Sequence, residues 1–207
     1  MTASTPIYTS AIRRLALLPE VFTGGELAVL FGWKSGICST YLASWRKAGL
    51  VQSLGGRSDV HMNLLRNAQA SPLLALRRAY PQAVKIGMDV LREAGWTTQI
   101  PSVIDIAVPS GSTLHHLPGF ALTTRTAKWY ASVSSGTEHA AHGIDRLQPA
   151  WALADMLARA KDTRVRHAWL PDPEDLDLPR IHACKQLLPA LQALGLGMEN
   201  MQTAGYA

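Results

Sequence analysis

The stretch Val21–Leu64, VFTGGELAVLFGWKSGICSTYLASWRKAGLVQSLGGRSDVHMNL, carries the signals of a helix, a turn, a second helix and a hairpin. Thr23 is placed to cap the first helix, and Glu26 three residues later completes a capping box. Gly32 ends this helix, and Gly49 ends the second one where a left-handed conformation is favoured. The order of these signals predicts a helix-turn-helix.

Apolar residues recur at helical spacing in both helices, which predicts one buried face for each. In the first helix these residues are Leu27, Leu30 and Phe31, and in the second they are Ile37, Cys38, Tyr41, Leu42, Trp45 and Ala48.

The opposite face of the second helix combines small hydroxyl side chains with two cations at its end. Hydroxyl groups can reach phosphates or base edges, and lysine and arginine add charge toward the DNA backbone. This composition predicts a recognition helix that lies in a major groove. The predicted DNA contacts of the turn and this helix are Lys34, Ser35, Ser39, Thr40, Ser44, Arg46 and Lys47.

Two short segments after this helix, Val51–Leu54 and Val60–Leu64, can pair as strands across a turn that begins with two glycines. Those glycines permit a tight turn, which puts Arg57, the last predicted DNA contact, at its tip. A basic hairpin beside a recognition helix predicts a winged helix-turn-helix. The alternative is a small helical core whose surface hairpin binds nothing.

Charge is distributed unevenly along the 207 residues, of which 47% are hydrophobic and 17% charged. Residues 1–85 hold ten lysines and arginines against three acids, a net charge of +7, whereas residues 86–207 hold ten against twelve, a net charge of −2. The positive excess therefore accompanies the helix-turn-helix, as a DNA-binding domain requires.

Features that point to a membrane or an oxidising compartment are lacking in the sequence. No apolar run approaches the ~18 residues of a membrane span, and the first residues do not have the pattern of a signal peptide. Cys38 and Cys184 lie far apart, which favours two reduced thiols over a disulfide. We therefore expect a cytoplasmic protein without membrane contact.

The rest of the chain predicts an α+β fold. A domain over residues 1–68 begins with a helix at 8–18, in which Ile12, Leu15 and Leu18 point inward. Arg13 and Arg14 in this helix either follow a phosphate backbone or face solvent. A second domain over residues 69–207 is expected to place helices beside a small mixed sheet. Its expected helices are 72–80 (a bridge between the domains), 83–94, 147–161 and 180–194, its expected strands are 103–108, 120–126 and 129–134, and a mobile glycine-rich tail follows.

Asp155 lies close to the apolar face of the expected helix 147–161. It is either a buried acid with a backbone or arginine partner, or it only flanks the apolar stripe.

Motifs of catalysis and metal binding are not found. Metal-dependent nucleases need Glu/Asp-x-Lys after a strand, and the nearest string is Asp162-Thr-Arg164, whose arginine cannot act as a base. No Gly-Ser pair is followed closely by Asp-x-Asp, the pattern of a nucleotidyltransferase. His115-His116 and Glu138-His139-Ala-Ala-His142 lack the spacing of zinc hydrolases, so solvated loop histidines are favoured over a metal site. We therefore expect no enzyme activity, metal or cofactor.

The strings that carry a family resemblance lie in both domains: Phe22–Ala28 and Tyr41–Val51 in the first, and Gly87–Trp96, Thr98–Pro109 and Ile144–Leu157 in the second. They resemble the AbiEi family, the antitoxins of bacterial type IV toxin–antitoxin (abortive infection) systems. The first two strings are similar to the winged-helix half of the family. The turn after Gly55 departs from the family, because it lacks an aromatic glycine-x-tyrosine ending.

The resemblance implies a transcriptional repressor that binds double-stranded DNA of its own promoter and opposes a nucleotidyltransferase-like toxin without forming a stable complex. We expect it to bind as a pair on inverted repeats. The alternative is a protein-interaction module whose second domain binds a partner protein directly.

Overall fold

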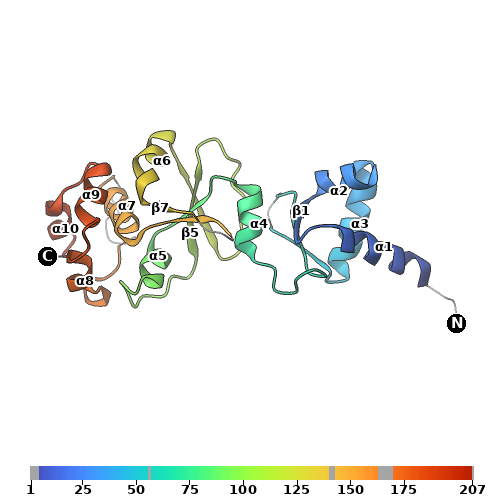
Figure 1. The fold of residues 1–207 in the computed structure, drawn as a ribbon, viewed down its shortest axis with the longest axis horizontal. Helices are drawn as coiled ribbons and strands as arrows, with labels where there is room; N and C mark the ends of the chain where they lie inside the picture. Colours follow the sequence, from blue (N-terminus) through green and yellow to red (C-terminus); the bar gives the residue numbers. More distant parts are fainter. Residues whose placement is uncertain (1–4, 56, 140–142, 163–169, 207) are drawn as a thin grey trace. The chain divides into compact units, whose positions relative to one another are not determined.

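The computed structural model describes residues 5–55, 57–139, 143–162 and 170–206, and the chain divides into two compact units, Met1–Pro81 and Gln82–Ala207 (Figure 1). The first unit thus extends beyond the predicted boundary at residue 68. The reason is helix α4 (Pro72–Ala79), which buries Ala75 and Leu76 and packs on the sheet of the first unit instead of bridging two domains.

The first unit combines four helices with a three-stranded antiparallel sheet of order β1-β3-β2. The central strand pairs Met62 with Val21 on one side and His61 with Ser53 on the other. Strand β1 was not predicted, because three residues carry no periodicity and become a strand only through their partner. The elements are α1 (Thr5–Leu17), β1 (Val21–Thr23), α2 (Gly24–Phe31), α3 (Ser35–Lys47), β2 (Val51–Ser53), β3 (Val60–Asn63) and α4.

The predicted cap at the start of α2 and the predicted glycines at the ends of α2 and α3 are confirmed, whereas α1 begins at Thr5 and not at residue 8. The amide of Glu26 donates to Thr23 Oγ1 at 3.0 Å and the amide of Thr23 donates to Glu26 Oε2 at 2.8 Å, which is the capping box. Gly32 and Gly49 adopt φ values of +64° and +69°, the left-handed conformation that glycine favours. Helix α3 begins at Ser35, two residues earlier than the apolar pattern indicated.

The core of the first unit is formed by one face of each of the helices α1, α2 and α3. Four residues that were predicted to point inward do not: Ile12, Leu30 and Ile37 are 39%, 54% and 45% exposed, and Ala48 is also exposed. Each lies at the edge of its apolar stripe, where a small unit has no second layer to cover it. The buried set is Leu15, Leu18, Phe22, Leu27, Cys38, Leu42, Trp45 and Val51.

The second unit is built around a five-stranded mixed sheet of order β6-β5-β4-β8-β7. The pairs β4–β8 and β5–β6 are parallel, and β4–β5 and β7–β8 are antiparallel, so the chain has the predicted α+β fold. The strands are β4 (Val84–Ile86), β5 (Ile104–Pro109), β6 (Phe120–Arg125), β7 (Thr137–Glu138) and β8 (Asp145–Leu147). The α-helices are α5 (Met88–Glu93), α6 (Ala127–Val133), α7 (Pro149–Asp162), α8 (Leu178–His182), α9 (Leu187–Ala193) and α10 (Met198–Thr203).

Two expected elements at the sheet of this unit were wrong. The expected helix 83–94 is strand β4 followed by α5, because Gly87 turns the chain between them with φ +75°. The expected strand 129–134 is helix α6, because the side chain of Thr126 accepts a hydrogen bond from the amide of Trp129 at 3.2 Å and thereby starts a helix.

The C-terminal region also differs from the prediction. The expected helix 180–194 is divided into α8 and α9. The tail is not irregular: it contains α10, and its last described residue, Tyr206, is fully buried and donates its hydroxyl to the carbonyl of Pro171 at 2.7 Å. Tyr206 and the buried Leu196 and Met201 thus fix a segment whose glycines suggested mobility.

None of the described helices has both the length and the apolar character that a bilayer crossing requires.

Candidate nucleic-acid interface

The outer face of α3 carries a continuous row of exposed polar and basic side chains. A helix rises about 1.5 Å per residue, so the row from Ser35 to Lys47 is roughly 18 Å long. All seven predicted residues of the turn and the helix are exposed. They are Lys34, Ser35, Ser39, Thr40, Ser44, Arg46 and Lys47.

The start of α3 favours an anion. Lys34 occupies the N-cap position without a side-chain cap, and the first turn contains no acid. A cation near the positive end of a helix dipole opposes helix stability, so folding alone does not account for a lysine there. The same charge, together with the positive end of the helix dipole, attracts phosphate.

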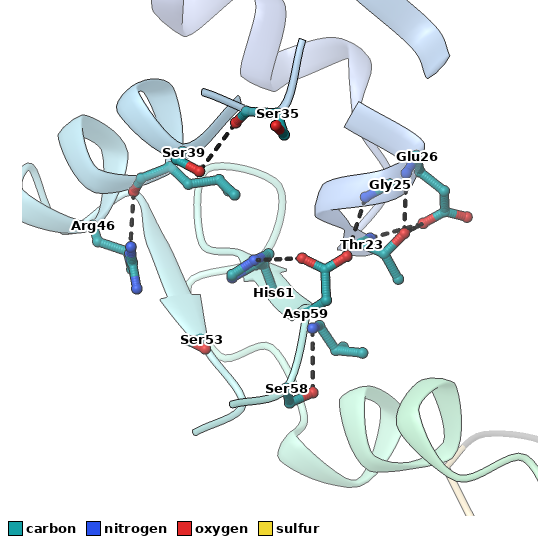
Figure 2. Close-up of polar contacts among 12 residues, drawn as sticks. Thr23, Gly25, Glu26, Ser35, Ser39, Arg46, Ser53, Ser58, Asp59 and His61 are labelled. Carbon is teal, nitrogen blue, oxygen red and sulfur yellow. Dashed lines mark hydrogen bonds and ion pairs between the residues drawn. The ribbon is translucent and has the colours of Figure 1, made fainter. Parts of the chain in front are cut away.

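Two hydroxyls in the middle of the row bond to their own helix. Ser39 Oγ donates to the carbonyl of Ser35, and Thr40 Oγ1 donates to the carbonyl of Gly36, both at 3.0 Å (Figure 2 shows the serine bond). Such bonds use the hydroxyl hydrogen and leave the oxygen lone pairs available. Both side chains can therefore accept from a base amino group without losing the contacts that orient them.

The last turn of α3 supplies the strongest charge of the row. The guanidinium Nε of Arg46 donates to the carbonyl of Leu42 at 3.3 Å, which leaves its two amino groups pointing away from the helix backbone. Among the described residues, no carboxylate lies within ion-pair distance of Arg46, Lys47 or Lys34. Their charge is therefore available to an external anion.

The predicted hairpin is confirmed by the antiparallel pairing of β2 with β3. Leu54 donates its amide to the carbonyl of Val60 at 3.0 Å, and Ser58 donates to the carbonyl of Gly55 at 3.2 Å. Gly55 has φ +114°, and its neighbour Gly56 lies outside the described residues. Arg57 is exposed in this turn, and in the described part of the chain it has no carboxylate partner.

Asp59, at the end of the same turn, ties the hairpin to α2. Its carboxylate accepts from the amide of Gly25 at 3.1 Å (Figure 2), and its carbonyl accepts from the amide of Gly24 at 3.2 Å. A Cβ on Gly24 would stand only 2.5 Å from Asp59 Oδ1, so glycine permits this approach. No sequence pattern revealed the contact, because its partners are 34 residues apart.

His61 lies buried at the base of the hairpin, between Asp59 and α3 (Figure 2). Its Nε2 is 3.9 Å from Asp59 Oδ1, and its Nδ1 has no partner among the described residues. Burial lowers the pKa of His61, the carboxylate of Asp59 opposes this shift, and the nearby charge of Arg46 reinforces it. A neutral imidazole thus supports the strand beneath the exposed row.

The second unit contains buried ion pairs. Asp155 is buried and accepts from Arg125 Nη2 at 2.6 Å and from Trp129 Nε1 at 2.7 Å, so it is the buried acid with an arginine partner. Burial raises the pKa of Asp155, which Arg125 and the Trp129 hydrogen bond oppose. Lys85 and Asp89, both buried, form another ion pair at 2.5 Å.

The histidines considered for a metal site do not gather. Among the described residues, no three histidine, cysteine or acidic side chains lie together as metal ligands. His139 Nδ1 lies 2.8 Å from Asp145, and Glu138 accepts from Arg146 at 2.8 Å. His142 lies outside the described residues.

Comparisons with known proteins concern only the fold. No protein-family model and no curated protein matches the chain. Among solved structures, the crystal structure of the RV2827C protein from Mycobacterium tuberculosis is similar, with a TM-score of 0.50, 14% sequence identity, and coverage of 96% of this chain and 81% of that chain. The likeness therefore extends over the two units together and supports the α+β assignment.

Proposed function

We propose that this protein is a DNA-binding transcriptional regulator. Its first unit acts as a winged helix-turn-helix, in which α3 enters a major groove and the β2–β3 hairpin is the wing. The observation that carries the proposal is the exposed row of α3, whose cations have no carboxylate partner in the described part of the chain. The hydroxyl groups in the middle of the row can form hydrogen bonds with base edges, and the cations at its ends can bind phosphates.

The regulatory role follows from the resemblance of the chain to AbiEi-type antitoxins. In this role the protein binds inverted repeats in its own promoter as a pair, represses its toxin–antitoxin operon, and opposes a nucleotidyltransferase-like toxin without a stable complex. A symmetric pair of winged helices places two recognition helices on half-sites one helical turn apart or a multiple of it.

The experiment that tests this function is binding to DNA from directly upstream of its own gene, against a scrambled duplex, at two salt concentrations. Specific binding that persists against scrambled competitor is the expected result. Weak and equal binding to both duplexes, lost as salt rises, would mean that the first unit only has a basic surface and would overturn the proposal.

A second candidate function is direct binding of a partner protein by the second unit. It is favoured by an open hollow of about 530 Å³, whose lining includes Met88, Met156 and Asp105. Ile100 and Val103 also line this hollow and are 85% and 39% exposed, and apolar side chains exposed together can mark a protein-interaction surface. Co-purification with the product of the neighbouring gene, lost on Ile100→Asp, would favour this candidate.

A further inference from the structure

Arg14 of α1 is held in a fixed position by aromatic side chains of the first unit. Its guanidinium carbon lies 5.2 Å from the ring centroid of Trp33 and 5.4 Å from that of Tyr41, and its Nη1 donates to the Tyr41 hydroxyl. The two rings are themselves stacked, with centroids 4.3 Å apart and planes at 22°. The left-handed turn at Gly32 brings Trp33 to this place, because it ends α2 one residue earlier.

The fixed guanidinium has unused hydrogen-bonding capacity. An arginine has five N–H donors, and the described contacts use one of them, toward Tyr41. In the described part of the chain no carboxylate lies within ion-pair distance of Arg14, and its side chain is only half-buried. The guanidinium of Arg14 is therefore a planar cation with free N–H donors, stacked on aromatic rings and partly exposed to solvent.

The position of this group relates it to the exposed row of α3. Tyr41 is on α3, three residues before the predicted contact Ser44, and residues three apart are neighbours on a helix surface. Arg14 therefore stands at the flank of the row, outside the face that would enter a groove. At the flank of a recognition helix the nearest DNA groups are backbone phosphates rather than base edges.

We propose that Arg14, Trp33 and Tyr41 form a phosphate-binding site for the DNA backbone at the edge of the groove that α3 occupies. The two aromatic rings orient the guanidinium before DNA binds, so that little side-chain entropy is lost when it binds a phosphate. Arg13, the preceding residue of α1, is exposed, and among the described residues no aromatic ring lies against its guanidinium, so it is not part of the site. This inference rests on the proposed function.

The test compares Arg14→Ala, Arg14→Lys and Tyr41→Phe with the control Arg13→Ala, using the duplex from upstream of the gene over a range of salt concentrations. Arg14→Ala should lower the salt slope of binding by about 0.9, the value of one phosphate contact, on operator and scrambled duplexes alike. Arg14→Lys should keep the salt slope but raise Kd several-fold, because lysine retains the charge but lacks the planar guanidinium that stacks on the rings and donates two parallel hydrogen bonds. Tyr41→Phe should do the same more weakly, and Arg13→Ala should change neither quantity.

Duplexes with one phosphate at a time replaced by a neutral methylphosphonate locate the contact. The parent should lose affinity at a phosphate where Arg14→Ala loses none, a result that a merely structural arginine would not produce. The proposed phosphate site is wrong if Arg14→Ala has the same salt slope as the parent. It is also wrong if Arg14→Lys and Tyr41→Phe both have the Kd of the parent. Either result leaves the proposal of DNA binding intact. A parent that does not bind DNA overturns both proposals, and thermal unfolding of each variant identifies any that fail to fold.

Discussion

The two units differ in how they use acidic side chains. In Met1–Pro81, nine lysines and arginines stand against three acids. All three acids have contacts inside the unit: Asp59 and Glu26 cap α2, Glu26 also forms an ion pair with Arg78 of α4, and Glu20 accepts from Asn67 at 3.0 Å. The acids of this unit therefore stabilise its turns and do not neutralise the cations of α3.

In Gln82–Ala207 ion pairs between acids and bases are more numerous, and some of them are buried. Arg125 pairs with Asp155 and Lys85 with Asp89, and Arg146 lies between Glu138 and Glu93. Charges that are paired in this way hold a fold, whereas the unpaired charges of α3 remain available to an external polyanion. The partners of charged residues, more than the number of charges, therefore distinguish a binding surface from a structural network.

The largest effect is expected from Asp155→Ala, which tests the structural side of this comparison. The substitution leaves Arg125 without its partner in a site where only 14% of its side chain is exposed. Removing one partner of a buried ion pair costs about 3–5 kcal/mol. Urea unfolding followed by the amide signals of the second unit measures this change, and Glu174→Ala, at an exposed acid, is the control. A loss below about 1 kcal/mol would contradict the internal role of the pair.

The next effect tests the binding side. Lys47→Ala combined with Arg57→Ala should lower the salt slope of DNA binding by roughly 1.8 and weaken binding to all sequences by on the order of tenfold, because two phosphate contacts are lost. Titration of labelled duplexes at several salt concentrations gives both quantities. The control Lys128→Ala, which removes an exposed cation of the second unit, should leave the salt slope and the affinity unchanged. If Lys128→Ala lowered them as much as the double substitution does, the two units would not differ in DNA binding.

A smaller effect is expected from Gly24→Ala. The added Cβ would displace the Asp59 carboxylate from the start of α2, and loss of a helix cap costs about 1 kcal/mol. Thermal unfolding of the first unit measures the loss, with Gly36→Ala, where a Cβ meets open space, as control. If both variants unfold at the same temperature as the parent, Asp59 does not stabilise the hairpin junction.

The smallest effect concerns pH. The pKa of His61 is lowered from its ordinary value of about 6.5, so the unfolded chain takes up a proton before the folded one does. Stability from this residue is complete above pH 6.5 and falls as pH drops below that value. Unfolding of the first unit measured between pH 7.5 and 5 should show this fall, and His61→Gln should flatten it. An identical pH profile for both proteins would show that His61 does not contribute.

The sequence was sufficient wherever a structural signal is local. The capping box at Thr23, the left-handed glycines at Gly32 and Gly49, and the hairpin between β2 and β3 each depend on residues close in the chain. The exposed face of α3 also followed from periodicity, so the predicted DNA contacts on it lie where they were expected. What they bind stays a prediction.

Contacts between distant segments could not be predicted. The bond from Gly25 to Asp59, the support of Arg14 by Trp33 and Tyr41, and the three-residue strand β1 all depend on tertiary pairing. The strand-like sequence at 129–134 is a different case, because the signal that makes it a helix is local: Thr126 caps the amide of Trp129, three residues later, and this cap was missed. Short segments with mixed propensity adopt the structure that their surroundings stabilise.

The hydrogen bond between Gly25 and Asp59 also makes one amide proton a spectroscopic reporter. Arg57 and Asp59 share a five-residue turn, so a phosphate held by Arg57 shifts the carboxylate that the Gly25 amide contacts. The nitrogen-bound proton of Gly25 should therefore change its chemical shift and its exchange rate with water when DNA is added, although Gly25 belongs to α2 and not to the wing. A single resolved glycine resonance can follow wing engagement in the intact chain.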